Sequence, residues 1–257
     1  MFSLTVTCNK MWTTLIVIFV FGTTSGLVSA SEPKNLPPYL TPCKKDAPNF
    51  DACCLSSARA GLPSIVNGDK EYGIPNFKPL KVEKVEINTA TLKVLIEDMD
   101  LWGLDEADIK DFKMDLTNNE VRIDFHCPQI KILGKYKMDG KINLLTLNGN
   151  GDVNITLEQP DISFSINYKL IKKGDFDYVQ MQDSKNISYN IQKLYINFEN
   201  LFNGNEQLGK TTNDFLNKEW KSLIEDLNPT IKTTINTIAV SIINGVTAKI
   251  PYQNLFL

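Results

Sequence analysis

The stretch WKSLIEDLNPTIKTTINTIAVSIINGV, residues 220–246, has an apolar side chain at every third or fourth position. The apolar positions are Trp220, Ile224, Leu227, Ile231, Ile235, Ile238, Ile242 and Val246. Steps of three and four place them on one face of an α-helix. We therefore predict one helix over residues 213–249, on the order of 50 Å long at about 1.5 Å per residue. Pro229 is expected to kink it in its first third.

The second half of this predicted helix, from Thr233 to Ala248, contains no charged residue. The residues between the apolar positions include Thr233, Thr234, Thr237, Ala239, Ser241 and Asn244, which are small or polar but uncharged. A surface helix normally has a charged face toward water. We therefore expect other parts of the chain to enclose this helix on more than one side.

Upstream, from about Leu80 to Phe198, the period of the apolar residues changes to two. The clearest alternating sets are Ile162, Phe164, Ile166, Tyr168 and Leu170; Val121, Ile123, Phe125 and Cys127; and Phe112, Met114 and Leu116. Such alternation is typical of antiparallel strands with one wet face. The Asp139-Gly140 and Asn148-Gly149 pairs predict tight hairpin turns.

A short helix is expected earlier, over residues 51–66. Together these patterns predict an α+β fold, in which a strongly curved antiparallel sheet wraps a long C-terminal helix and a short N-terminal helix precedes both. Residues 31–257 are expected to form a single domain, since one core is sufficient at this length.

The first thirty residues have the pattern of a secretory signal peptide. Lys10 precedes an apolar run from Leu15 to Phe21, and small residues follow up to Ala30. The run is shorter than the roughly 20 residues that a membrane span needs. We predict cleavage after Ala30 and a secreted protein, with an uncleaved anchor as the alternative.

Cleavage removes Lys10 and no acidic residue, so the formal net charge changes from −3 to −4. The balance is mildly acidic and no run of lysine or arginine occurs. These features argue against nucleic acid or an anionic membrane as a partner, and no stable membrane insertion is expected. We expect a monomer, with a receptor as a further partner.

Loss of Cys8 with the signal peptide leaves Cys43, Cys53, Cys54 and Cys127. An even number of cysteines in an oxidising compartment indicates disulfides. A bridge between the neighbours Cys53 and Cys54 would be strained, so either of the two other pairings is favoured. The chain has one histidine and no paired C-x-x-C spacing, so no metal site is predicted.

Two sequons, Asn154-Ile-Thr and Asn186-Ile-Ser, are candidate N-glycosylation sites. Catalysis has little support, because the single histidine, His126, is expected on the polar strand face with Arg122 and Asp124. No nucleophile elbow, phosphate-binding glycine loop or zinc-protease motif occurs. We predict that the protein is not an enzyme and needs no cofactor.

A curved apolar sheet around a helix either packs solidly or leaves a tunnel. Ligand sites are concave and mostly apolar, with few polar groups, so an elongated sheet and helix could hold an apolar ligand. Composition alone does not separate a filled core from a tunnel.

Four stretches resemble the insect takeout and juvenile hormone-binding protein family, in the right order and over nearly the whole mature chain. They are LPPYLTPCKKDAPNFDACC (36–54), YGIPNFKPLKVEKV (72–85), GKYKMDGKINLLTLNGNGDVNITL (134–157), and LNKEWKSLIEDLNPTIKTTI (216–235) with AKIPYQNLFL (248–257). Each motif is weak alone, and together they are specific.

The resemblance implies a long helix wrapped by a curved sheet, related to tubular lipid-binding modules. It implies a secreted carrier whose internal tunnel holds juvenile hormone, another terpenoid or a long-chain lipid, and roles in hormone transport, feeding or daily rhythm. It also implies a disulfide between Cys43 and Cys53, ten positions apart. Cys54 and Cys127 depart from the common one-disulfide pattern, and they are either free or joined by a second bridge.

For such a carrier we expect inward-facing residues of strands and helix to line the tunnel. The candidates are Phe125, Tyr136, Phe164, Ile166, Tyr168, Trp220, Ile224, Ile231, Ile235 and Ile238. The hydroxyls of Tyr136 and Tyr168 could bond an ester or carboxyl end of the ligand. The alternative is a secreted signalling protein with a filled core that acts through its outer surface.

Overall fold

The computed structural model describes residues 33–142 and 145–257. Its α-helices are α1 (Phe50–Ile65), α2 (Glu206–Lys218) and α3 (Trp220–Thr247), with short 3-10 turns at Leu104–Glu106, Phe202–Gly204 and Tyr252–Leu255. Its strands are β1 (Leu80–Asn88), β2 (Leu92–Trp102), β3 (Asp108–Asp115), β4 (Glu120–His126), β5 (Gln129–Ile142), β6 (Leu145–Glu158), β7 (Asp161–Lys173), β8 (Phe176–Asn190) and β9 (Lys193–Phe198). The predicted signal peptide, with Cys8, lies outside the described residues.

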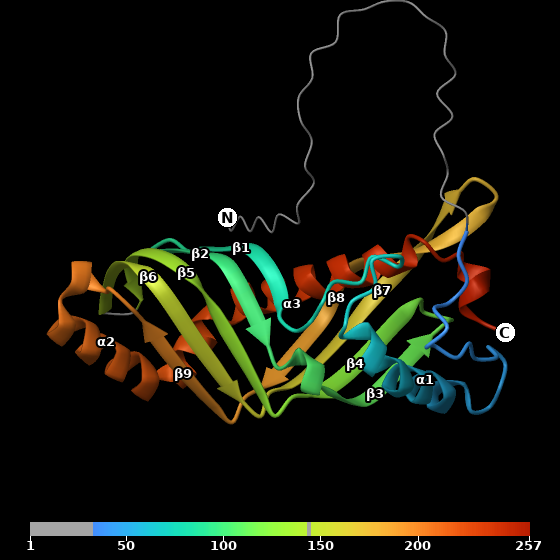
Figure 1. The fold of residues 1–257 in the computed structure, drawn as a ribbon, viewed down its shortest axis with the longest axis horizontal. Helices are drawn as coiled ribbons and strands as arrows, with labels where there is room; N and C mark the ends of the chain where they lie inside the picture. The colour runs from blue at the N-terminus through green and yellow to red at the C-terminus, as the bar shows by residue number, and fades with distance from the viewer. Residues whose placement is uncertain (1–32, 143–144) are drawn as a thin grey trace, which may run out of the picture.

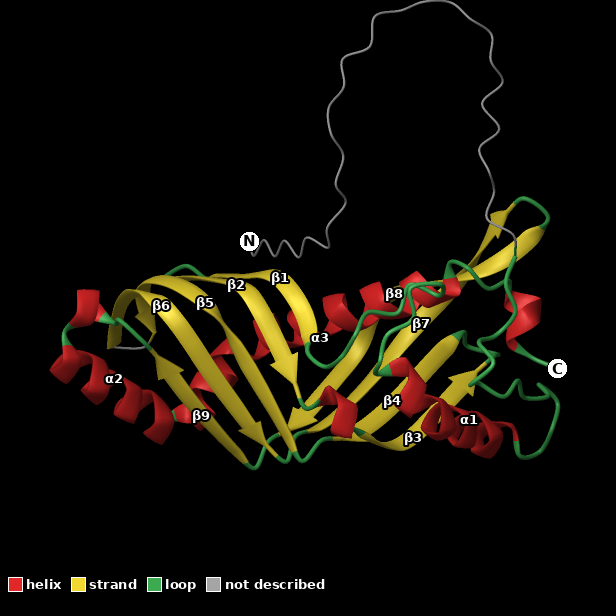
Figure 2. Ribbon diagram, viewed as in Figure 1, coloured by secondary structure: helices red, strands yellow, loops and turns green. Residues whose placement is uncertain are grey.

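The strands form two antiparallel sheets along an elongated molecule (Figures 1 and 2). One sheet has the order β1-β2-β5-β6-β9 and the other has the order β3-β4-β7-β8. The long helix α3 runs behind both of them (Figure 1). The predicted class, α+β with antiparallel strands around a long C-terminal helix, is confirmed. The single wrapping sheet is instead two sheets that do not close.

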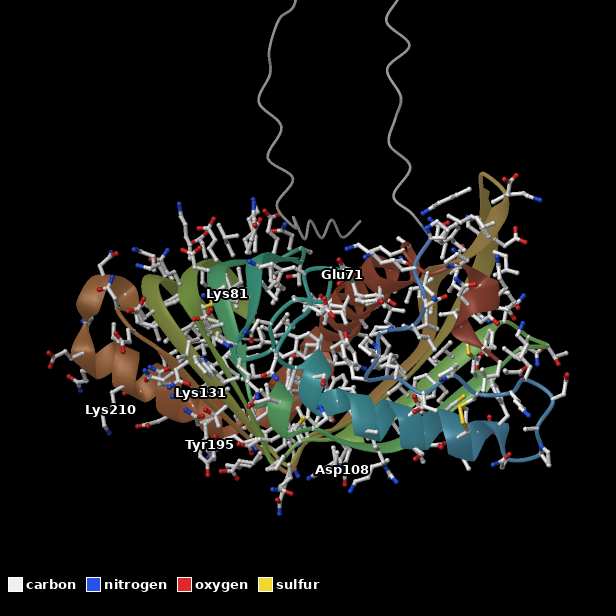
Figure 3. The ribbon with its side chains drawn as sticks, turned by 45° about the vertical axis from the view of Figure 1, so that its right-hand side comes forward. Glu71, Lys81, Asp108, Lys131, Tyr195 and Lys210 are labelled. Carbon is white, nitrogen blue, oxygen red and sulfur yellow. A yellow bond between two sulfur atoms is a disulfide. The ribbon has the colours of Figure 1, made fainter. Side chains whose placement is uncertain are left out.

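The expected N-terminal helix is confirmed as α1, which packs against β3. The guanidinium of Arg59 on α1 donates a hydrogen bond to the carbonyl of Ile109 in β3, at 2.8 Å. At the start of α1, Cys53 forms a disulfide with Cys43, whose Cα atom lies 6.0 Å away (Figure 3). This bridge fastens the segment before α1 to the helix itself.

The two predicted hairpin turns are wrong, because both dipeptides lie inside long strands. Asp139 of β5 pairs directly with Asn148 of β6, and the Asn148 side-chain amide donates to the Asp139 carboxylate at 2.9 Å. The glycines are needed for another reason. Gly140 has a φ of +133°, and an added Cβ would lie 2.2 Å from the Thr91 carbonyl oxygen. Glycine inside a strand often marks such a close backbone approach.

The strand β7 extends past the packed part of its sheet. Leu170, expected on the apolar face, is 41% exposed. It pairs with Val179 near the tip of the β7–β8 hairpin, which projects beyond the other strands (Figure 1). The alternation therefore indicates the strand correctly, but Leu170 itself is exposed although its partner Val179 is buried.

The predicted C-terminal helix is in fact two helices, since α2 ends at Lys218 and α3 begins at Trp220. Glu219 separates them with φ −98° and ψ 20°. The apolar stripe begins at Trp220, which is the first residue of α3 and is buried. Pro229 lies inside α3, and the helix continues past it.

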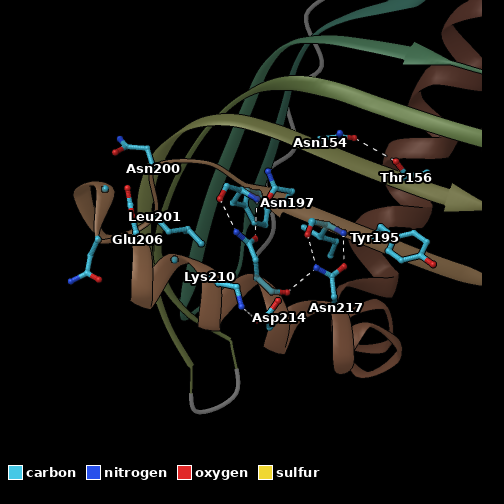
Figure 4. A pocket seen from close by; sticks show the side chains of 16 residues that line it. Asn154, Thr156, Tyr195, Asn197, Asn200, Leu201, Glu206, Lys210, Asp214 and Asn217 are labelled. Carbon is cyan, nitrogen blue, oxygen red and sulfur yellow. Dashed lines mark hydrogen bonds and ion pairs between the residues drawn. The ribbon is translucent and has the colours of Figure 1, made fainter.

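Asparagine side chains attach both C-terminal helices to free sheet edges. From α2, Asn217 accepts from the Ile196 N–H at 2.7 Å and donates to the Ile196 carbonyl at 2.7 Å. Asn213 does the same for Phe198, at 3.0 and 2.9 Å (Figure 4). From α3, Asn244 accepts from the Met181 N–H of β8 at 2.7 Å. The primary amide of asparagine can therefore replace the next strand.

We expect Asn217→Leu to lower the free energy of unfolding by about 1–2 kcal/mol, because it leaves the N–H and C=O of Ile196 without partners. Urea denaturation followed by circular dichroism would measure this. The control is Asp214→Ala, which removes only an exposed ion pair with Lys210. Equal urea midpoints for the two variants would show that the bonds from Asn217 to the edge of β9 contribute nothing to stability.

Candidate functional site

An apolar cavity lies between α1, the four-stranded sheet and the C-terminal part of α3. Its volume is about 260 Å³. It is lined by Leu36, Leu40, Thr41, Cys43, Cys54, Ser57, Ala58, Ile65, Phe112, Met114, Val121, Ile123, Val179, Met181, Ile243, Thr247, Leu255 and Phe256. None of these residues is charged. Drug-sized ligand sites usually occupy about 300–1,000 Å³ and are mostly apolar, so this cavity is small but has the right chemistry.

Three residues of the lining have hydroxyl side chains: Thr41, Ser57 and Thr247. Thr41 is exposed and Ser57 is partly exposed. The Ser57 hydroxyl accepts a hydrogen bond from the backbone N–H of Thr41 at 2.8 Å. Thr247 is buried, at the last position of α3. The lining therefore has two polar groups near solvent and one inside.

One wall of the cavity is formed by segments from both ends of the described chain. The backbone N–H of Leu257 donates to the carbonyl of Cys43 at 3.0 Å. The ammonium of Lys45 lies over the rings of Tyr252 and Phe256, at 4.4 and 4.5 Å from their centroids. Such cation–π contacts add stability. The disulfide loop and the C-terminal tail thus form one wall together.

The alternative of a second disulfide is not what the structure shows, because Cys54 and Cys127 are both free. Cys54 lines the cavity, whereas Cys127 is fully buried after β4 and is absent from the lining. Burial raises the pKa of the Cys54 thiol to about 11, and the Asp51 carboxylate adds to the shift. Burial, with Glu106 and Asp105, raises the pKa of Cys127 to about 12. Both side chains act as small neutral groups at neutral pH.

We expect alkylation of Cys54 by iodoacetamide at pH 8 to be on the order of a hundredfold slower than that of a free cysteine of pKa about 8.5, because only the thiolate reacts. The raised pKa favours the thiol, so the rate should rise about tenfold per pH unit and reach no plateau below pH 11. Mass spectrometry of the labelled peptide would follow this. A plateau near pH 8.5 would contradict the burial of Cys54.

The ten residues predicted to line a tunnel do not line this cavity. Phe164, Ile166 and Tyr168 belong to the apolar cluster of the four-stranded sheet, and Phe125 and Ile235 pack against it. That cluster also contains Val121, Val179 and Met181, which do line the cavity. Half of the predicted set therefore packs directly behind the cavity wall.

The other five predicted residues lie farther along the molecule. Tyr136 is in the core cluster of the five-stranded sheet, and Ile238 packs against it. Trp220 is buried, and Ile224 and Ile231 are partly buried on α3. The role of all ten residues in ligand contact stays a prediction.

The two tyrosines expected to offer a hydroxyl differ. The Tyr136 hydroxyl donates to the Glu199 carbonyl at 2.7 Å, and burial raises its pKa to about 12. The Tyr168 hydroxyl is buried without a hydrogen-bond partner. Burial, with the neighbouring Tyr252, raises the pKa of Tyr168. Only Tyr168 therefore has unused hydrogen-bonding capacity.

The sequence does not identify the cavity lining as one group of residues, although the strand residues in it show the alternation of apolar and polar positions. Phe112 and Met114 of β3 and Val121 and Ile123 of β4 all belong to the alternating apolar sets. The remaining wall comes from α1, β8 and the end of α3, together with irregular segments near the chain ends that have no periodicity. Only the folded structure brings those segments to the strands.

A second, larger hollow of about 580 Å³ lies between β9 and α2 (Figure 4). Its lining mixes apolar residues with many polar ones, among them Lys210, Glu206, Asp214 and the sequon residue Asn154. We call this open hollow the polar groove because, unlike the cavity, it has charged side chains in its lining, which favour a wholly apolar ligand less than the uncharged cavity does. The second sequon residue, Asn186, is exposed on β8.

His126 lies outside both hollows. Its Nδ1 is 2.8 Å from the Asp161 carboxylate and its Nε2 is 3.1 Å from the Gln159 side-chain oxygen. Within residues 33–142 and 145–257, no group of three or more His, Cys, Asp or Glu side chains could hold a metal ion. No helix in the same part of the chain is long and apolar enough to span a membrane.

Comparisons with known proteins agree with this architecture. The family model described as haemolymph juvenile hormone binding protein matches residues 16–257. The crystal structure of Epiphyas postvittana Takeout 1 superposes with a TM-score of 0.69 at 26% identity, covering 79% of this chain and 94% of that one.

Two curated relatives extend the comparison. The circadian clock-controlled protein daywake of Drosophila melanogaster is 26% identical over 230 residues, 85% of this chain and 88% of its own. A putative beta-carotene-binding protein of Schistocerca gregaria is 27% identical over 122 residues, 47% of this chain and 49% of its own.

Proposed function

The chain belongs to the haemolymph juvenile hormone binding protein family, and from that premise we propose that it is a secreted carrier of a small apolar ligand, such as a juvenile hormone, another terpenoid or a lipid. The observation that carries the proposal is the apolar cavity beneath α1, whose lining contains no charged residue. The ligand would be held by burial, and the protein would perform no chemistry on it.

The energetics favour such a role. Each buried CH₂ group contributes about 0.8 kcal/mol. Ten such groups give a gross stabilisation of roughly 8 kcal/mol, from which the cost of association must be subtracted. The resulting affinity is useful for a carrier, which must also release its ligand.

We propose that the protein is not an enzyme. The His126 ring is held by Asp161 and Gln159, and it is not part of the cavity lining. The two free thiols have raised pKa values, which disfavour the nucleophilic thiolate. The chemistry of the cavity wall supports retention of a ligand rather than turnover.

Secretion rests on the predicted signal peptide of residues 1–30, and glycosylation on Asn154 and Asn186. Asn154 lies at the polar groove and Asn186 is exposed, so a glycan at either site would avoid the cavity. Expression in insect cells, with N-terminal sequencing and glycosidase treatment of the medium, would test both.

The direct test of the carrier proposal is ligand extraction. Protein purified from insect-cell medium would be extracted with organic solvent and the extract analysed by mass spectrometry, with a medium blank as control. We expect a co-purifying apolar molecule, and a higher melting temperature after addition of juvenile hormone or a fatty-acid ester. An empty extract together with no thermal shift would refute the proposal.

We further propose that the ligand space continues from the cavity along α3 toward the ten predicted residues. Support comes from the α3 side chains Ile231, Ile235, Ile238 and Ile242, which are only partly buried. If the space continues, Ile235→Trp should weaken binding of a long ligand more than that of a short one. Displacement titrations with ligands of two lengths would measure this, and an unfolded variant would indicate solid core at that position.

The family also contains the daywake relatives, whose names describe them as circadian clock-controlled. A signalling protein acting through its outer surface is therefore the alternative. Under that alternative the cavity would be a packing defect, and the extract would be empty.

A further inference from the structure

The Thr247 hydroxyl is the one buried polar group on the cavity wall whose hydrogen bond is missing in the described part of the chain. Thr247 is 8% exposed, it lines the cavity, and its Oγ1 has no hydrogen-bond partner. A buried hydroxyl without a partner costs about 1–3 kcal/mol. Such groups are uncommon in folded proteins and call for an explanation.

Other threonines of the same helix show that the missing bond is particular to this position. The hydroxyls of Thr233, Thr234 and Thr237 donate to the carbonyls four residues earlier, at 2.8, 3.0 and 2.9 Å. This is the usual way in which a threonine in a helix satisfies its hydroxyl. Thr247 does not make it, so its donor and acceptor capacity is left for something else.

The cavity limits what that partner can be. Its lining has no Lys, Arg or His side chain that could neutralise an anion. Burying an unpaired charge is far more costly than burying a neutral oxygen. Ser57 already accepts a bond from the Thr41 N–H, and both lie toward solvent. The interior of the cavity therefore suits an apolar molecule with one neutral oxygen.

We propose that Thr247 anchors the ligand: its hydroxyl bonds a carbonyl, ester or alcohol oxygen, and the surrounding apolar residues select against a carboxylate. This inference rests on the proposed carrier function and specifies the ligand class for the same site. Scaling from the roughly 150 Å³ cavity that holds benzene, this cavity accommodates on the order of ten non-hydrogen atoms. The oxygen-bearing end of the ligand fills it.

Three probes of matched size separate these features: 1,4-diisopropylbenzene, 4-isopropylacetophenone and 4-isopropylbenzoate. They differ only in whether one substituent is a hydrocarbon, a ketone or a carboxylate. Each would displace N-phenyl-1-naphthylamine from the full secreted protein at pH 7.5, with fluorescence as the readout. Wild-type protein is expected to bind the ketone best and the carboxylate worst.

The variant Thr247→Val keeps the shape of the side chain and removes the hydroxyl. We expect it to bind the ketone three- to tenfold more weakly, the size of one hydrogen bond, with hydrocarbon binding unchanged or tighter. Thr247→Ser should restore ketone binding. The matched control is Thr233→Val, which makes the same substitution at an exposed position of the same helix that does not line the cavity and should leave the ketone-to-hydrocarbon ratio unchanged.

Without ligand, Thr247→Val should melt at the same temperature as wild type or higher, because an unsatisfied hydroxyl is lost. If that variant misfolds, the same comparison is made between Thr247→Ala, which removes the hydroxyl, and Thr247→Ser, which keeps it. An equal loss for ketone and hydrocarbon, or no loss, would overturn the anchor while leaving the carrier proposal intact. If wild type binds neither the fluorescent probe nor any of the three compounds, the carrier proposal and the anchor both fall.

Discussion

The variant Ala58→Trp is expected to weaken binding of an apolar ligand by more than about 100-fold and to leave the fold intact. Ala58 lies on α1 and lines the cavity with a single methyl group. An indole at this position would occupy the space that the ligand needs. Excluding four CH₂ groups would cost roughly 3 kcal/mol, which corresponds to a factor above 100.

The same helix provides the matched control. Ala60 is exposed two residues farther along α1 and does not line this cavity. Ala60→Trp should therefore bind the ligand as wild type does, by isothermal titration or fluorescent displacement. Circular dichroism would check that both variants fold. Equal affinities of the Ala58 and Ala60 variants would show that the ligand binds elsewhere.

Removal of the disulfide, in the double variant Cys43→Ser/Cys53→Ser, should lower the free energy of unfolding by about 2–3 kcal/mol. The bridge closes a loop of sequence separation 10, and a 15-residue loop corresponds to about 3 kcal/mol. Urea denaturation under non-reducing conditions would measure the change.

We also expect faster ligand release from this double variant, because Cys43 lines the cavity and its carbonyl accepts from the N–H of Leu257. Loosening Cys43 would loosen the C-terminal tail in the same wall. The control is Cys54→Ser, which alters the neighbouring free thiol and keeps the bridge. A double variant with wild-type stability and release rate would refute the structural role of the disulfide.

The fold class could be predicted because the local patterns are strong. Two patterns each mark the buried face of one element: the alternation in Phe164, Ile166 and Tyr168, and the apolar stripe from Trp220 onward. The division of the C-terminal helix could not be predicted from this stripe. The first of the two helices, α2, is bonded to the edge of β9 through Asn213 and Asn217, and one-dimensional periodicity does not contain such contacts.

The turns were mispredicted for a similar reason. Asp-Gly and Asn-Gly pairs favour hairpin turns in isolation, but Gly140 and Gly149 are required where another backbone or side chain approaches closely. The site was only partly predictable. The strand residues Met114 and Val121 have the alternating signal, whereas Leu36, Leu255 and the unpartnered hydroxyl of Thr247 reach the cavity through tertiary contacts.

The edges of the sheets have a consequence for behaviour at high concentration. A free strand edge is a template for strand addition, and hence for aggregation. Here Asn217 blocks β9, Asn244 blocks β8, and Arg59 bonds a carbonyl of β3. The remaining outer strand, β1, carries Lys81 and Lys84, and lysines on an edge discourage strand addition. In the described part of the chain, each outer strand is therefore bonded or carries lysines, which leaves few sites where another copy could add a strand.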